Sequence, residues 1–117
     1  MRKSIGAETT FLEDLQGFEG MFAALAQLSA KVWRHAETAK MTGKTVTLKV
    51  KYFDFQILTR SKTLAHPVQD EAALAAISTG LLARLAPAKG VRLLGVTLSN
   101  LEAAGAEPIQ GQMVLEL

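Results

Sequence analysis

The segment Thr45-Val46-Thr47-Leu48-Lys49-Val50-Lys51-Tyr52 alternates polar and apolar side chains without interruption. Such alternation is typical of a β-strand that buries one face and leaves the other in water. Val46, Leu48 and Val50 would point at a core, while the threonines and lysines between them would face solvent. We therefore expect an antiparallel strand over 45–53 whose wet face is cationic.

Three further strands are expected on either side of this one. The first covers 3–11, where Gly6 would leave the backbone bare for close approach by a ligand or a neighbouring strand. The second covers 56–64 and follows a turn or bulge at Phe53-Asp54-Phe55. The third covers 91–101 and is apolar enough to be central in a sheet.

Two helices are predicted between these strands. From Phe18 to Ala39 apolar residues recur at steps of three and four, which places Phe18, Phe22 and Trp33 in the core, and Thr42-Gly43 would end the helix in a turn. The second helix follows Asp70, a suitable N-cap, and ends before Pro87. Its inner face would consist of Leu74, Ile77, Leu81 and Leu85.

The order β-α-β-β-α-β predicts an α+β split fold. Two helices would pack on one face of a four-stranded antiparallel sheet, and the other face would stay open and hold the cations. At 117 residues, 49% of them hydrophobic, the chain is long enough for one domain with its own core.

Composition excludes several classes of protein. The absence of cysteine rules out disulfides and thiolate metal sites and suits a reducing cytosol. No apolar run approaches the roughly 20 residues that span a bilayer, and no signal-peptide core follows Met1, so we expect no membrane partner. The net charge of +2 is too small to argue for nucleic acid, but five basic residues and a single acid, Asp54, fall within 44–64.

The sequence shows no active site of its own. His35 and His66 have no second ligand at metal spacing, and no phosphate loop or catalytic triad occurs, so we predict no catalytic residue, no metal and no cofactor. The segments Thr59-Arg60-Ser61-Lys62-Thr63 and Val91-Arg92 instead combine cations with hydroxyls and backbone amides. Such strands can grip phosphates without reading bases, although a simple solvated sheet face would have the same composition.

Several short motifs occur in an order that resembles a known family. They are Lys3-Ser4-Ile5-Gly6, Glu8-Thr9-Thr10-Phe11 with Asp14, Lys44 to Lys49, Asp54-Phe55, Thr59-Arg60-Ser61, Thr63-Leu64 and Val91 to Val96. Together they resemble the C-terminal little finger domain of the Y-family translesion DNA polymerases, most of all bacterial DNA polymerase IV. The match covers essentially the whole chain.

The resemblance implies that 1–101 is a non-catalytic domain that grips the primer-template duplex in its major groove. Its DNA contacts would fall on Lys3, Ser4, Gly6, Thr59, Arg60, Ser61, Lys62 and Arg92. The magnesium ions of the family belong to a catalytic domain that this chain lacks. The domain would act as a monomer in the bacterial cytoplasm, within a protein that serves DNA repair.

The resemblance also assigns the C-terminal end. A linker over 102–111 would lead to a sliding-clamp peptide over 112–117, with contacts from Gln112, Met113, Leu115 and Leu117. Two rival readings remain open. One is a protein-interaction module of a catalytically inactive polymerase relative, and the other is a small ferredoxin-like ligand-binding domain, which would need a pocket with convergent polar groups.

Overall fold

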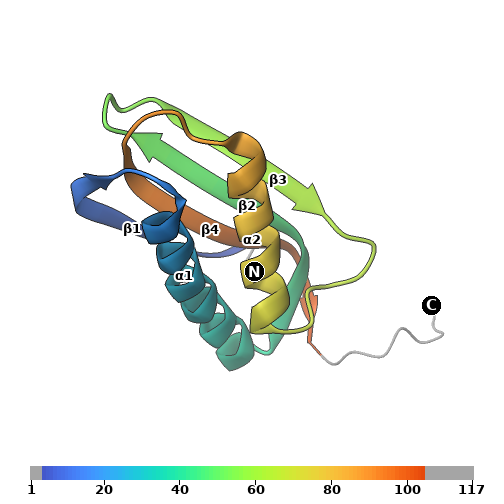
Figure 1. Ribbon diagram of the computed structural model, residues 1–117. Helices are drawn as coiled ribbons and strands as arrows, with labels where there is room; N and C mark the ends of the chain where they lie inside the picture. The colour runs from blue at the N-terminus through green and yellow to red at the C-terminus, as the bar shows by residue number, and fades with distance from the viewer. Residues whose placement is uncertain (1–3, 105–117) are drawn as a thin grey trace.

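A computed structural model describes residues 4–104, in which two helices lie side by side on one face of a single sheet (Figure 1). The elements are β1 (Ser4–Leu15), α1 (Phe18–Ala39), β2 (Met41–Tyr52), β3 (Ile57–Thr63), α2 (Glu71–Leu85) and β4 (Val91–Ala103). The predicted α+β order βαββαβ is therefore confirmed. The strands lie in the order β1-β4-β2-β3 and every neighbouring pair is antiparallel, so β4 is central as predicted.

The alternation in β2 decides what the core contains. Val46, Leu48 and Val50 are fully buried beneath the helices, as predicted. Each is paired in register with a buried residue of β4, because Val46 lies opposite Leu98 and Leu48 opposite Val96. The two central strands therefore present one continuous apolar surface to α1 and α2.

Helix α1 buries most of the predicted apolar stripe, but near its start Met21 faces the core in place of Phe18 and Phe22. Its buried side chains are Met21, Leu25, Leu28, Ser29, Val32 and Ala36. Phe18 and Phe22, expected in the core, are 40% and 37% exposed, and their rings stack on each other with centroids 5.4 Å apart. Because each residue turns a helix by about 100°, Phe22 lies well to one side of Met21. Trp33 is partly buried against the core, as predicted.

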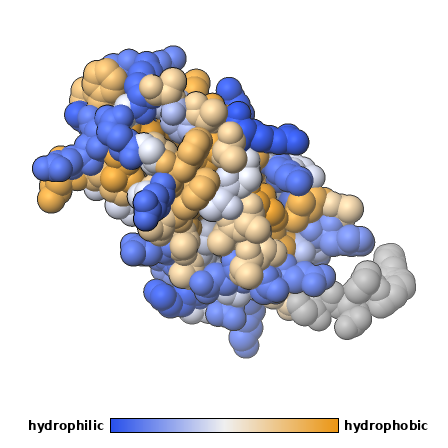
Figure 2. Space-filling model, in the orientation of Figure 1, coloured by the Kyte–Doolittle hydropathy of each residue, from blue (hydrophilic) through white to orange (hydrophobic). Residues whose placement is uncertain are grey.

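Helix α2 begins and ends where the sequence indicates. The Oδ1 atom of Asp70 accepts a hydrogen bond from the backbone N–H of Ala73 at 2.7 Å, which confirms the predicted N-cap. Leu74 and Leu81 are buried as expected, whereas Ile77 is only partly buried. The helix side of the molecule shows apolar residues across its middle and hydrophilic residues around its rim (Figure 2).

Strand boundaries differ from prediction at both ends of β2 and at the C-terminal ends of β1 and β4. Helix α1 ends at Lys40 in a left-handed conformation (φ 57°), and Thr42-Gly43 is paired strand rather than the expected turn. A Cβ at Gly43 would collide with the carbonyl oxygen of Ser99, so this glycine permits close strand approach. Strand β4 continues to Ala103, which places the first two residues of the predicted linker inside the sheet. Strand β1 likewise runs to Leu15.

No helix within residues 4–104 is both long and apolar enough to cross a membrane.

Adjacent residues of β2 test this arrangement. Leu48→Ala should reduce the free energy of unfolding by about 2–5 kcal/mol, because a fully buried leucine leaves a cavity when it is truncated. Lys49→Ala, on the opposite face, should cost no more than about 1 kcal/mol, since it removes only an exposed ion pair. Urea denaturation followed by circular dichroism measures both, and equal losses would contradict the assigned faces.

Candidate nucleic-acid interface

The face of the sheet opposite the helices carries four rows of side chains that cross all four strands. We call this surface the open face. The strand registers give its rows, in the order β1-β4-β2-β3, as Ser4-Ser99-Thr45-Thr63, Gly6-Thr97-Thr47-Ser61, Glu8-Gly95-Lys49-Thr59 and Thr10-Leu93-Lys51-Ile57. The first two rows consist of hydroxyl-bearing residues and one glycine.

Hydroxyl groups on the open face are linked across the strands. The Oγ1 of Thr45 lies 2.9 Å from that of Thr63, and the Oγ1 of Thr47 lies 2.8 Å from the Oγ of Ser61. The side-chain amide of Asn100 donates to Thr45 at 2.7 Å. Because each hydroxyl carries one proton and two lone pairs, every linked pair keeps one proton for an outside acceptor.

Gly6 lies in this hydroxyl-rich region and is exposed. A Cβ there would approach Thr97 Oγ1 to 2.9 Å, closer than real Cβ contacts allow. The missing side chain therefore lets Thr97 of β4 lie close against the backbone of β1. This agrees with the prediction that Gly6 permits close approach by a neighbouring strand, and approach by a ligand at Gly6 stays a prediction.

The open face is less cationic than predicted. Lys49 Nζ lies 3.4 Å from Glu8 Oε2 within the same row, so this lysine is paired with an acid. Arg60 and Lys62 lie opposite Leu48 and Val46, whose side chains face the helices, and they therefore point to the helix side of the edge strand β3. The expectation that they share the bare face is wrong.

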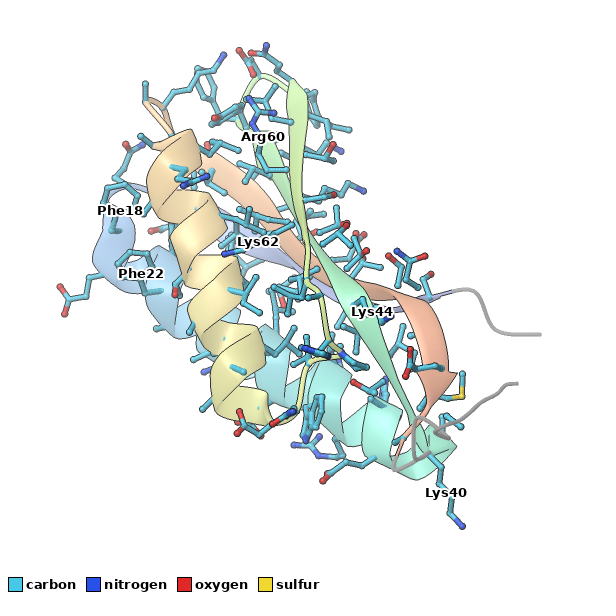
Figure 3. The ribbon with its side chains drawn as sticks, turned by 90° about the vertical axis from the view of Figure 1, so that its right-hand side faces the viewer. Phe18, Phe22, Lys40, Lys44, Arg60 and Lys62 are labelled. Carbon is cyan, nitrogen blue, oxygen red and sulfur yellow. The ribbon has the colours of Figure 1, made fainter. Side chains whose placement is uncertain are left out.

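The two cations remain solvated because β3 is the edge of the sheet. Both are exposed, and Figure 3 shows Lys62 directed toward α2. Lys62 lines a groove between β3 and α2 together with Ile77, Leu81 and Arg84. Inward-pointing charges on an edge strand are a common defence against pairing with other chains. Sequence alternation alone missed this, because the turn before β3 decides which of its residues face inward.

The outer edge of β3 offers backbone groups. Leu64 N donates to Lys44 O at 2.8 Å, and Tyr52 N donates to Gln56 O at 2.9 Å. Since hydrogen bonding alternates along an antiparallel pair, even-numbered residues of β3 bond to β2, and Thr59 and Ser61 direct their backbone groups outward. Arg60 Nη1 accordingly donates to the outward carbonyl of Thr59 at 2.7 Å.

Around this edge, three kinds of donor converge. Backbone amides point straight out, the hydroxyls of Thr59 and Ser61 lie on the open-face side, and Arg60 and Lys62 lie on the helix side. A polyanion along β3 could accept from all three. The consecutive residues 59–62, all predicted DNA contacts, therefore lie on both sides of one sheet edge instead of sharing one face.

Arg92 lies at the hairpin end of the open face. The β2–β4 register shifts between Lys51 and Tyr52, and Arg92 occupies the resulting bulge. Its Nε lies 3.4 Å from Asp14 Oδ1, and its guanidinium carbon lies 4.8 Å from the centroid of the Phe55 ring. Lys51 Nζ lies 5.0 Å from the same ring. The sequence indicated a turn or bulge at Phe53-Asp54-Phe55 but did not predict the contacts of Phe55 with these two cations.

Ser4 is exposed at the start of β1, in the first row of the open face. Lys3 and the predicted clamp contacts Gln112, Met113, Leu115 and Leu117 lie outside the described residues. His35 and His66 are exposed, and residues 4–104 contain no group of three histidine or acidic side chains placed to hold a metal ion.

Comparison with protein families gives one match over nearly the whole chain. Residues 2–113 match the impB/mucB/samB family C-terminal domain. Among curated proteins, DNA polymerase IV of Gluconobacter oxydans is 45% identical over 108 residues, which cover 92% of this chain and 30% of that protein. DNA polymerase IV 2 of Agrobacterium fabrum is 48% identical over 102 residues, covering 86% and 29%. The chain spans about 30% of the length of these relatives.

Solved structures include one whose length matches this chain. A complex of the β-clamp processivity factor and the little finger domain of PolIV is similar with a TM-score of 0.70 and 25% identity, covering 97% of this chain and 99% of that one. An insertion ternary complex of Dbh DNA polymerase gives a TM-score of 0.76 at 17% identity over 86% of this chain, which supports the fold alone.

The turn beside Arg92 contains an ion pair that can be tested by titration. Lys89 Nζ lies 2.6 Å from Asp54 Oδ2, and the backbone N–H of Gln56 donates to Asp54 Oδ1 at 3.2 Å. The hydrogen bond from Lys89 and then that from Gln56 lower the pKa of Asp54 below its ordinary value. The ionised Asp54 therefore stabilises the folded turn at any pH above the ordinary aspartate pKa. This stabilisation is lost as the pH falls through the lowered pKa of Asp54.

We expect NMR titration of the Asp54 side-chain carboxyl to give a pKa below that of an unpaired aspartate. Lys89→Met should raise this pKa toward the ordinary value, since it removes the largest cause of the shift. Lys31→Met, an exposed change on α1, is the matched control and should leave the pKa of Asp54 unmoved. An unchanged Asp54 pKa in Lys89→Met would show that the ion pair does not form in solution.

Proposed function

The chain belongs to the impB/mucB/samB family C-terminal domain, the little finger of Y-family DNA polymerases, and from this premise we propose that it holds primer-template duplex by its phosphates. The outer edge of β3 carries this proposal. It combines outward amides, three hydroxyl side chains and two cations within one seven-residue strand. Contacts of this kind fix position on a duplex and carry no sequence information.

The open face would extend the contact across the sheet. From the β3 edge, the linked hydroxyls of Thr47 and Ser61 lead to the bare backbone at Gly6, and Arg92 flanks the hairpin end. Ser4, at the start of β1, would add a contact on the far edge of the sheet. Lys3, which precedes it in the sequence, is proposed as a further contact. Neutral donors predominate, which suits a domain that must slide along DNA and accept damaged templates.

The activity of the longer protein is part of the same proposal. Its relatives named DNA polymerase IV are about three times as long as this chain, so nucleotide transfer and its magnesium ions would belong to the remainder. The parent would be an error-prone lesion-bypass polymerase of the bacterial cytoplasm. This domain would supply grip on the duplex and no chemistry.

We further propose that the chain docks on a sliding clamp. The similar little finger domain of PolIV was solved in complex with the β-clamp processivity factor. In this chain, Gln112-Met113-Val114-Leu115-Glu116-Leu117 has the pattern of an amide followed by spaced aliphatic side chains. Leu115 and Leu117 would fill an apolar cleft on the clamp.

Fluorescence anisotropy with a labelled primer-template duplex tests the DNA contacts. Arg60→Ala combined with Arg92→Ala should weaken binding by a similar factor on unrelated sequences, because phosphate contacts are lost. The slope of log affinity against log salt should become shallower by about one for each contact removed. Arg34→Ala, an exposed cation on α1, is the matched control and should leave both quantities unchanged. An unaltered affinity in the double variant would refute the proposed grip.

Deletion of 112–117 tests the clamp peptide separately. The shortened chain should lose binding to the sliding clamp in surface plasmon resonance and keep the duplex affinity of the full chain. Leu115→Ala with Leu117→Ala should reproduce the loss, whereas Glu116→Ala should not. Normal clamp binding by the deletion variant would assign docking to another part of the domain.

A further inference from the structure

Phe55 occupies a backbone conformation that phenylalanine rarely adopts. Its φ is +69°, in the left-handed region, where a bulky side chain is strained. The turn closes through hydrogen bonds from Tyr52 N to Gln56 O and from Phe55 N to Tyr52 O, both at 2.9 Å. In three-residue hairpin loops of this kind, the left-handed position usually holds glycine.

The strain is not offset by burial of the ring. Phe55 is 61% exposed and is absent from the hydrophobic core. The charged groups of Lys51 and Arg92 lie 5.0 Å and 4.8 Å from its ring centroid, both within cation–π distance. A strained, exposed aromatic residue that contacts two cations points to a role at a site.

The turn that carries Phe55 is fixed to the segment preceding Arg92. Lys89 Nζ donates to Asp54 Oδ2 at 2.6 Å and to Gln56 Oε1 at 2.8 Å. Phe53 N donates to the carbonyl of Gly90 at 3.0 Å. Three hydrogen bonds therefore join the turn that carries Phe55 to the segment that precedes Arg92.

Arg92 is held from two sides. Its Nε faces Asp14 Oδ1 at 3.4 Å, and its guanidinium plane lies by the ring of Phe55. The two terminal nitrogens have no protein partner among residues 4–104. A guanidinium held in this way loses little side-chain freedom on binding and presents its remaining donors to a phosphate.

We propose that Phe55 is a positioning residue for DNA binding, whose ring holds Arg92 ready for a backbone phosphate of the duplex. The inference rests on the proposed function, since it assumes that Arg92 contacts DNA. Phe55 itself need not touch the nucleic acid. Replacement by another aromatic residue should preserve the effect, whereas an aliphatic residue of similar volume should not.

A double-mutant cycle on the full chain tests this inference by fluorescence anisotropy with primer-template duplex. Phe55→Leu should weaken binding about two- to five-fold, the range expected for an exposed cation–π contact. Phe55→Tyr should bind as the wild type does. In an Arg92→Ala background, Phe55→Leu should have no further effect, because the group it positions is gone. Phe53→Leu, in the same turn and 48% exposed, is the control.

Phe55→Gly is the control for a folding defect, because glycine relieves the strain of the left-handed conformation. This variant should lose affinity like Phe55→Leu while its Tm does not fall, so that unfolding cannot explain the weaker binding. Wild-type affinity in Phe55→Leu, or an equal loss with and without Arg92, would overturn the positioning role alone. Wild-type affinity in Arg92→Ala would overturn both this inference and the contact on which it rests.

Discussion

The register between β2 and β4 is the constraint on which the rest of the molecule depends. Side chains alternate between the two faces of a strand, so a slip of one residue would exchange the faces of every paired position. The buried pairs Val46–Leu98 and Leu48–Val96 exclude such a slip, because it would place Thr47 and Lys49 in the core. The hydroxyl rows of the open face are thus a consequence of the core.

This constraint explains why the candidate interface is rich in neutral donors. The positions that face away from the helices are every second residue of each strand. In β2 the sequence places threonines and lysines at these positions. Lys49 is then paired with Glu8, and Thr47 with Ser61. Hydroxyls attract phosphate less than free cations do and create no strong field of their own. A surface of this kind suits a loose, sliding grip better than a tight one.

Sequence reasoning recovered the element order, the topology and the central place of β4, because these follow from strong periodicity and from apolar content. It failed where a turn determines which residues of the next strand face the helices. The three residues from Phe53 to Phe55 form a tight loop, and its length determines that Arg60 and Lys62 face the helix side. The exposure of Phe18 and Phe22 was missed because two overlapping helical stripes fit α1, and only the packing against the sheet selects the one with Met21.

The two cations of the edge strand β3, Arg60 and Lys62, can both oppose pairing with other chains and attract a polyanion. An unpaired edge invites association with other chains, and inward cations such as Arg60 and Lys62 oppose it. The outward amides of Thr59 and Ser61 pair with no neighbouring strand in residues 4–104, and the cations beside them leave these amides accessible. A phosphate backbone can accept from those amides, and its negative charge is attracted by the cations beside them. Protection against a wrong partner and affinity for a polyanion therefore come from the same placement of charge.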